Sequence, residues 1–321
     1  MSAAQKSDER GLGLVVIGDA HLTLSAGEPF EDAPTYRRTL GGDALLTAIV
    51  AARAGVQVAL VTRVGEDDFT DWMLQTFEAE RLHLDYTRQV AGPNPVMLLG
   101  TGRDGRQSAR YVGAGSAVSL DPSDLVDIPW DLARLVFVPG SLQALGAAER
   151  QTAVVAFETA RAAGVRTVYD PTLVPGQWAR EDTGAARAAF EAMLPHTDVL
   201  IIGAPYAAGK LLGRPLAAEA AREALHRGVS AAVVRHSDGS VIVADARGAH
   251  TIAAEAGADG PGDASRPAVF DGALVAALAK GFPLVDAAAL ASAADRAAPL
   301  AQRDLDSLPS REAIRAHFES A

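Results

Sequence analysis

Short apolar runs of strand length alternate along this chain with longer stretches that have helical spacing. The first run, Leu14–Ile17, is followed at once by Gly18 and Asp19, a typical strand end. The predicted strands are residues 14–17, 56–61, 135–138, 167–169, 199–202 and 231–234, with a small antiparallel pair at 240–244 and 250–253. The predicted helices are residues 44–54, 68–80, 147–163, 215–227, 270–280 and 284–297, with a short one after Ser310. This alternation predicts a three-layer α/β/α fold, in which a mostly parallel sheet carries helices on both faces.

Two polar stretches, residues 19–40 and 90–115, interrupt this alternation. In the second stretch the apolar runs 96–99 and 108–112 flank Gly102–Gly105, a pattern typical of a β-hairpin. Such excursions from one edge of an α/β core can build a small β lid over a ligand crevice. No linker is long enough to separate two independent domains. We therefore expect residues 1–321 to form one domain that carries a lid.

The charge balance and the absence of cysteine exclude several classes of function. The 40 acidic side chains outnumber 29 basic ones, for a net charge of −11, whereas a nucleic-acid footprint needs clustered Lys and Arg. Without Cys there is no disulfide, thiolate metal site or thiol nucleophile. No apolar run reaches the roughly 18–20 residues that span a bilayer, and the first residues lack a signal-peptide core. We expect a soluble, cytoplasmic protein without a nucleic-acid or membrane partner.

Ligands of open parallel sheets bind outside the carboxyl ends of the strands, so the residues that follow each predicted strand are the site candidates. These segments are 18–19, 65–68, 170–172, 203–206, 235–239 and 259–263. The last contains Gly260, Pro261, Gly262 and Asp263 shortly before a predicted helix. Glycines let a backbone approach a ligand, and a helix N-terminus attracts phosphate. A carboxylate beside such a turn could take the proton of an attacking hydroxyl group.

Four segments, in matching order and spacing, resemble the motifs of the PfkB (ribokinase-like) family of carbohydrate kinases. They are GGDALLTA at 41–48, VALVTRVGEDDFTDWML at 58–74, DPTLVPGQW at 170–178, and GPGDA at 260–264 followed by FDGALVAALAKG at 270–281. The first is similar to the family's double Gly before an Ala-rich helix, and the last to its Gly-Ala-Gly-Asp-Ala-Phe signature. The resemblance covers nearly the whole chain and implies a ribokinase-like fold.

The resemblance also implies an activity and a site. Members of the family transfer the γ-phosphate of ATP, with Mg²⁺, to a hydroxyl group of a sugar or a related alcohol. The implied catalytic residues are Asp263 as general base and Gly260 and Gly262 as donors to the moving phosphate. The implied nucleotide-binding residues are Arg235, Ser237, Gly239, Gly260 and Gly262. Candidate substrate-binding residues are Asp19, His21, Gly41, Gly42, Asp43, Arg110 and Asp170. A homodimer through the lid, common in this family, is also expected.

Several positions depart from the family's pattern. Substrate-binding Asn and Asp residues of the family fall on Leu46 and Thr23, and its Asn-x-x-Glu pair, which organises Mg²⁺, falls on Gly203 and Tyr206. This chain also has Val174 where the family has an Arg, and Ala258 and Asp259 where the family has two Thr. Pro261, which has no N–H, falls inside the anion hole. Residues 265–269 are extra, so a helix that begins at Pro267 would place its dipole about a turn from the hole.

These departures leave two hypotheses for function. The first is an ATP-dependent sugar kinase with Asp263 as its base, and the second is a catalytically weakened member that binds a ligand as a sensor or scaffold. A dinucleotide-dependent oxidoreductase is disfavoured, because no Gly-x-Gly-x-x-Gly turn follows the first strand. The His residues show no metal-ligand spacing. Asp67 and Asp68 suit either a metal pair or a helix N-cap at Asp68. No protein metal site is predicted.

Overall fold

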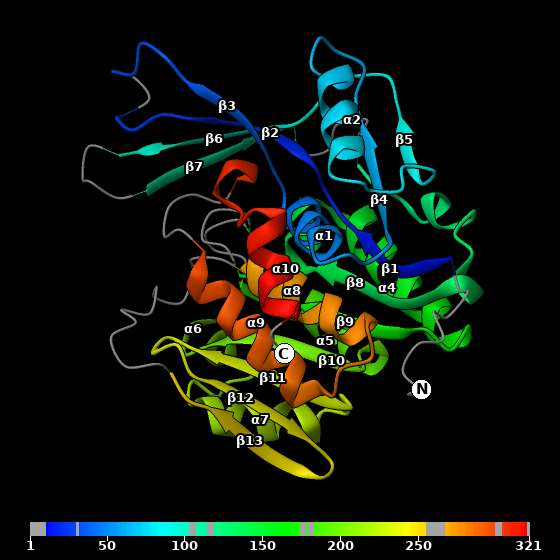
Figure 1. The fold of residues 1–321 in the computed structure, drawn as a ribbon, viewed down its shortest axis with the longest axis vertical. Helices are drawn as coiled ribbons and strands as arrows, with labels where there is room; N and C mark the ends of the chain where they lie inside the picture. Colours follow the sequence, from blue (N-terminus) through cyan, green and yellow to red (C-terminus); the bar gives the residue numbers. More distant parts are fainter. Residues whose placement is uncertain are drawn as a thin grey trace.

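A nine-stranded sheet forms the centre of the structure, a computed structural model that describes residues 11–29, 32–102, 107–113, 119–173, 178, 183–254, 267–298 and 304–319 (Figure 1). The strand order is β13-β12-β11-β10-β9-β8-β1-β4-β5. The strands are β1 (Leu12–Ile17), β4 (Val58–Val64), β5 (Thr87–Gln89), β8 (Ala133–Pro139), β9 (Arg166–Asp170), β10 (Val199–Ala204), β11 (Ala231–His236), β12 (Val241–Asp245) and β13 (Gly248–Ile252). Pairing is parallel from β11 to β5 and antiparallel only at β12 and β13. The mostly parallel sheet predicted from the sequence is confirmed.

Helices cover both faces of this sheet, as the three-layer prediction requires (Figure 1). One face carries α1 (Asp43–Arg53), α2 (Thr70–Ala79), α8 (Pro267–Ala279), α9 (Leu284–Ala297) and α10 (Arg311–Glu319). The other carries α3 (Gly140–Leu145), α4 (Ala147–Ala162), α5 (Thr183–Met193), α6 (Tyr206–Leu211) and α7 (Ala217–His226). Short 3-10 turns lie at Pro122–Leu125, Trp130–Leu132, Leu194–His196 and Leu305–Ser307. Among the described helices, none is long and apolar enough to cross a membrane.

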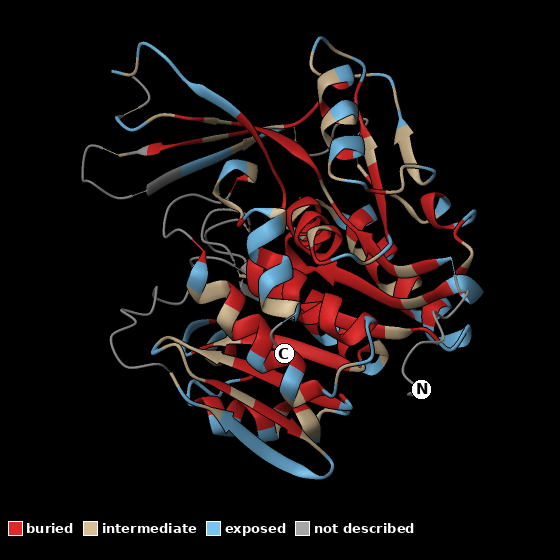
Figure 2. Cartoon of the chain, in the orientation of Figure 1, coloured by how far each residue is buried: buried red, intermediate tan, exposed pale blue. Residues whose placement is uncertain are grey.

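Strand β1 shows why the central strands read as continuous apolar runs. Its side chains alternate between the two hydrophobic cores, with Leu14 and Val16 in one and Val15 and Ile17 in the other. All four are fully buried, so both faces of the strand must be apolar (Figure 2). Burial on both sides therefore fixes this sheet between its two helical layers.

A second, four-stranded sheet projects from one edge of the molecule, in the order β3-β2-β6-β7 (Figure 1). Its strands are β2 (His21–Ser25), β3 (Arg37–Gly41), β6 (Val96–Thr101) and β7 (Gln107–Val112). They lie within the two polar stretches, and β6 and β7 form the predicted hairpin. The parallel pairing of β2 with β6 joins segments about 70 residues apart in sequence. The small β lid is confirmed, while the number of domains and the homodimer remain predictions.

Several elements of the structure had no counterpart in the sequence prediction. They are β2, β3, β5, α3, α5 and α6. Of these, α5 had a clear signal, because Ala186, Ala189, Phe190 and Met193 are buried at helical spacing on one face. Helix α8 begins at Pro267, within the extra residues 265–269 and three residues before the run predicted from Phe270.

The packing of α8 against α1 depends on Gly272. A Cβ atom at this position would lie 2.5 Å from Val50 Cβ and 2.8 Å from the Thr47 carbonyl oxygen. Real side chains do not approach this closely, so any larger residue would push the two helices apart.

We expect Gly272→Ala to lower the free energy of unfolding by about 1–3 kcal/mol, because the added methyl group overpacks the α1–α8 contact. Chemical denaturation of the purified protein measures this loss. Gly209→Ala in α6 is the matched control, since its Cβ would meet only Pro215 at 3.6 Å. The control should be neutral or slightly stabilising, because Ala favours helix over Gly. Equal destabilisation by both variants would contradict the packing explanation.

Candidate active site

The end of β1 and the start of α1 meet at two glycines. Gly42 has φ +115°, and a Cβ there would lie 2.4 Å from the Asp19 carbonyl oxygen. A Cβ on Gly41 would lie 2.5 Å from Thr23 Oγ1 and 2.7 Å from His21 Nε2. Both glycines therefore let the β3–α1 turn pass close to the segment that carries Asp19 and His21. Gly42 thus makes room for the backbone of Asp19, and Gly41 for the side chains of Thr23 and His21.

Asp19 and His21 form a buried pair at this turn. His21 Nδ1 lies 2.9 Å from Asp19 Oδ2, and the two side chains are only 6% and 10% exposed, respectively. The second oxygen of Asp19, Oδ1, is buried and has no hydrogen-bond partner among the described residues. An ionised carboxylate accepts hydrogen bonds and donates none, so this oxygen can receive a hydroxyl group of a ligand.

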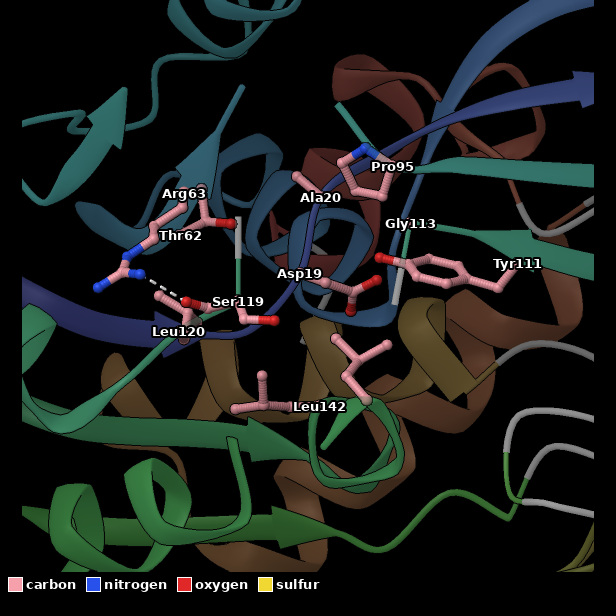
Figure 3. Close-up of a pocket in the computed structure, with 11 residues that line it drawn as sticks. Asp19, Ala20, Thr62, Arg63, Pro95, Tyr111, Gly113, Ser119, Leu120 and Leu142 are labelled. Carbon is pink, nitrogen blue, oxygen red and sulfur yellow. Dashed lines mark hydrogen bonds between the residues drawn. The ribbon is translucent and has the colours of Figure 1, made fainter. Parts of the chain in front are cut away.

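A small pocket, partly open to solvent, lies beside Asp19 (Figure 3). Its polar lining consists of Asp19, Thr62, Arg63, Tyr111 and Ser119. Its apolar lining includes Ala20, Pro95, Leu120, Leu142 and Leu145. These residues come from the carboxyl ends of β1 and β4, from the lid hairpin and the residues that flank it, from the segment before the 3-10 turn at Pro122–Leu125, and from α3. The pocket thus lies where an open α/β sheet presents ligands.

Arg63 stands on one side of the pocket, opposite Asp19 and Tyr111 (Figure 3). Its guanidinium group donates to Asp124 Oδ1 at 3.0 Å, Asp121 Oδ2 at 2.7 Å and the Ser119 carbonyl oxygen at 2.6 Å. Burial alone would lower the pKa of Arg63, but its hydrogen bonds with Asp124 and Asp121 raise it. Arg63 was not a predicted site residue, although a charged residue within an apolar strand was a possible signal.

Tyr111, in β7 of the lid, lines the pocket. Its ring meets the His21 ring edge-to-face, with centroids 5.5 Å apart. Burial and the nearby carboxylates of Asp19 and Glu149 raise the pKa of Tyr111 far above its ordinary value. The phenol therefore stays neutral and can donate a hydrogen bond. No sequence pattern singled out Tyr111, because a tyrosine in a hairpin is equally typical of simple packing.

The turn after β4 is tied to the base of the lid through Asn94. Asn94 donates from its backbone N–H to Asp67 Oδ2 at 2.7 Å, and its Oδ1 accepts from the Gly65 N–H at 2.8 Å. Burial alone would raise the pKa of Asp67, but hydrogen bonds from Asn94 and Phe69 outweigh it and lower that pKa. Phe69, not Asp68, occupies the N-cap position of α2. The described residues contain no group of three or more His, Asp or Glu that could hold a metal ion.

A second ionic group lies where α1, α8, β9 and β11 converge. Arg235 Nη2 lies 3.5 Å from Asp170 Oδ2, and its guanidinium group covers the Phe270 ring at 5.3 Å from the centroid. Asp170 also accepts the Thr172 N–H at 2.8 Å. Arg235, implied by the family resemblance to bind nucleotide, therefore turns inward to Asp170 in this structure.

Asp271, in the first turns of α8, joins this group and was not predicted as a site residue. It is 2% exposed and hydrogen-bonds with Asp170. Burial first, and then the charge of Asp170, raise the pKa of Asp271 well above its ordinary value, with Asp43 adding to the effect and Arg235 opposing it. These surroundings therefore favour the protonated form of the carboxyl group. An acidic residue within the apolar run AVFDGALVAALA was the available signal.

The remaining predicted residues divide into three groups. Ser237 and Gly239 form the turn between β11 and β12, where the Ser237 N–H donates to the Ala204 carbonyl oxygen at 3.1 Å. Arg110 is exposed on β7, opposite Leu98 of β6. Gly260, Gly262 and Asp263 lie outside the residues that the structure describes, as do Val174, Ala258, Asp259 and Pro261.

Comparison with known proteins shows to which protein family the chain is related. Residues 13–298 match the model of the pfkB family of carbohydrate kinases. The chain belongs to the pfkB family. This finding confirms the resemblance found in the sequence motifs.

The matches between this pfkB family protein and its curated relatives cover only part of each relative's length. A ribokinase of Staphylococcus aureus (strain COL) is 27% identical over 166 residues, which cover 49% of this chain and 53% of that protein. A 2-dehydro-3-deoxygluconokinase of Escherichia coli (strain K12) is 26% identical over 200 residues, 59% of this chain and 62% of that protein. The chain therefore spans little more than half the length of these relatives.

A solved structure extends the similarity to the fold as a whole. The fructokinase of Xylella fastidiosa with bound ATP has a TM-score of 0.77 and covers 96% of this chain and 98% of that chain, at 17% identity. At this identity the likeness establishes the ribokinase-like fold of the pfkB protein and nothing finer.

The pH dependence of stability should report the Asp271 carboxyl group. A raised native pKa means that the folded pfkB protein holds a proton that the unfolded chain releases above about pH 4, so stability falls as the pH rises. Asp271→Asn cannot lose a proton. We expect the variant to gain stability relative to wild type as the pH is raised from about 4 through the raised native pKa of Asp271.

Thermal unfolding across this pH range measures the difference. Asp286→Asn, an exposed acidic residue in the first turn of α9, is the matched control and should follow the wild-type pH profile. Parallel profiles for wild type and Asp271→Asn would show that Asp271 is ionised in the native protein.

Proposed function

We propose that this pfkB protein is an ATP-dependent phosphotransferase that phosphorylates a hydroxyl group of a sugar or a sugar-like small molecule. The observation that carries this proposal is the pocket beside Asp19, between the carboxyl ends of β1 and β4 and the lid. It presents an acceptor oxygen without a described partner, a neutral phenol and apolar walls, a combination suited to a polyhydroxylated ligand. Membership of a carbohydrate kinase family supports the reaction type.

Within this proposal, Asp19 accepts a substrate hydroxyl group, while His21 and Tyr111 position the carboxylate and the lid. His21 holds Asp19 through its Nδ1 atom and packs against the Tyr111 ring. Gly41 and Gly42 keep the α1 turn close to this pair. The substrate would then lie between the sheet and the lid, where partial exclusion of water strengthens each polar contact.

The proposed transfer uses Asp263 as general base. Its carboxylate would take the proton of the substrate hydroxyl as that oxygen attacks the γ-phosphorus, and the bond from this phosphorus to the bridging oxygen of ADP would break. Backbone N–H groups of Gly260 and Gly262 are the proposed donors to the moving phosphate. The proposed nucleotide-binding segment is the turn with Ser237 and Gly239, which follows β11.

Magnesium would enter with the nucleotide. The described residues contain no carboxylate or imidazole cluster of the kind that holds a metal, and Gly203 and Tyr206 carry no carboxylate. Mg²⁺ keeps several waters and binds readily through substrate phosphates, so a protein cage is not required. The fructokinase of Xylella fastidiosa, similar in fold, binds ATP, which supports ATP as the phosphoryl donor here.

A second candidate is a family member that binds a ligand but transfers phosphate weakly. The inward turn of Arg235 toward Asp170 favours it, because a guanidinium group engaged with a carboxylate has less positive charge to offer a nucleotide. Asp271 brings a further carboxyl group beside Asp170 in the same region. Pro261 also lacks the N–H that an anion hole uses.

Coupled measurement of ADP formation, with Mg²⁺·ATP and a panel of sugars and related alcohols, separates the two candidates. We expect turnover with at least one acceptor, and a loss of about 10²–10⁴-fold in Asp263→Asn, because the general base is removed. Asp259→Asn, which neutralises a nearby carboxylate in the same segment, is the matched control and should retain most activity. Binding of an acceptor without turnover would support the ligand-binding candidate instead.

A further inference from the structure

We infer that the pocket beside Asp19 selects an uncharged, hydroxyl-rich ligand and discriminates against sugar acids and sugar phosphates. The inference rests on the proposed function for the identity of the pocket as the acceptor site. It goes further by naming the charge class of the acceptor, which depends on the side chains that line and surround the pocket. The names of the two curated relatives refer to an uncharged sugar and to a sugar acid, so similarity alone does not decide this.

Arg63 is the first element of the argument, because it is the one cationic side chain among the described residues that line the pocket. An anionic ligand would need this guanidinium group as its partner. Asp124, Asp121 and the Ser119 carbonyl oxygen already accept from Nε, Nη2 and Nη1, respectively. The side chain is only 15% exposed, so it cannot swing to a ligand without breaking these bonds.

The surroundings of Arg63 have an excess of negative charge. Asp124 also lies 3.6 Å from Arg88, which in turn pairs with Asp127 at 3.0 Å. Three carboxylates therefore face two guanidinium groups in this cluster. Since Asp124 is nearly fully buried, its charge is poorly screened by water and reduces the attraction of Arg63 for an anion.

Asp19 is the second element. Its Oδ1 atom is buried without a described partner, and its Oδ2 faces His21. Oδ1 therefore requires a hydrogen-bond donor on the ligand. A hydroxyl group provides one, whereas a carboxylate or a phosphate dianion does not. An anionic group beside it would add like-charge repulsion to the cost of leaving water.

The lid adds no cationic side chain to the described lining of the pocket. Tyr111 contributes a neutral phenol from the lid, and Pro95, Leu120, Leu142 and Leu145 contribute apolar surface. Arg110, the candidate for binding an anion from the lid, is exposed on β7 and is not among the lining residues. The pocket thus combines an unpaired acceptor, a neutral phenol and no available cation.

Direct binding without nucleotide tests the inference separately from catalysis. Isothermal titration of wild type with D-ribose, D-fructose, D-gluconate, D-glucosamine and D-fructose 6-phosphate should give the tightest binding to an uncharged sugar, by at least tenfold over the charged ligands. Tighter binding of an acid, a phosphate or the amino sugar would overturn it, and so would failure of every uncharged sugar to bind.

Turnover distinguishes failure of the inference from failure of the proposed function. Binding of uncharged sugars with no ADP formation leaves the charge selectivity standing and removes the kinase proposal. Preferential phosphorylation of a sugar acid would support the kinase proposal and overturn the inferred charge selectivity.

Two matched variants test the electrostatic cause. Asp121→Asn removes a carboxylate that neutralises Arg63 and retains N-cap chemistry at the Pro122–Leu125 turn. We expect it to tighten binding of D-gluconate by about tenfold, with uncharged sugars little changed. Asp127→Asn also removes one negative charge, but this exposed carboxylate contacts Arg88, so the selectivity should stay as in wild type.

The result that would overturn the electrostatic cause is equal behaviour of the two variants. If Asp121→Asn and Asp127→Asn change D-gluconate binding alike, or if neither changes it, Arg63 neutralisation does not set the selectivity. Far-ultraviolet circular dichroism and thermal unfolding of both variants identify any loss of folding. Still tighter binding of D-gluconate to Asp121→Asn at lower ionic strength would confirm a charge effect.

Discussion

The close contact between the Gly41–Gly42 turn and the end of β1 is the constraint on which the site depends. A side chain at position 42 would collide with the Asp19 carbonyl oxygen, and one at 41 would displace Thr23 and His21. Because both positions are glycine, β3 can leave the lid sheet and continue directly into α1. The same turn therefore holds the lid over Asp19 and delivers Asp43 to the buried acidic group around Asp170.

Two arginines border the crevice, and carboxylates engage both. Asp121 and Asp124 bind Arg63 next to the acceptor pocket, while Asp170 binds Arg235 near the proposed nucleotide segment. The described part of the crevice therefore presents little available positive charge. This arrangement suits a neutral acceptor. In the proposed transfer, the moving phosphate would rely on backbone N–H groups and on Mg²⁺ that accompanies ATP, rather than on these arginines.

The site was predictable only in part. Asp19, His21, Gly41 and Gly42 were found because they follow a predicted strand or match a family motif, and the structure brings them together. Tyr111, Arg63 and Asp271 were missed, since their importance arises from contacts between distant segments. Arg235 was assigned to the nucleotide from the family resemblance and from its place after the predicted strand 231–234, but the identity of its partner, Asp170, is a property of the assembled sheet. The roles of Gly260, Gly262 and Asp263 remain predictions.

The sequence by itself determined the layered α/β architecture, the small β lid and the family, because these follow from apolar periodicity and from local motifs with fixed spacing. Only the tertiary structure decided which charges meet. Asp271 is an ordinary acidic residue until α8 brings it beside Asp170 at the end of β9, where burial and the charge of Asp170 raise its pKa. Arg63 is an ordinary cation until the 3-10 turn at Pro122–Leu125 surrounds it with carboxylates. Electrostatic properties depend on distance and burial in space, and spacing along the chain contains neither.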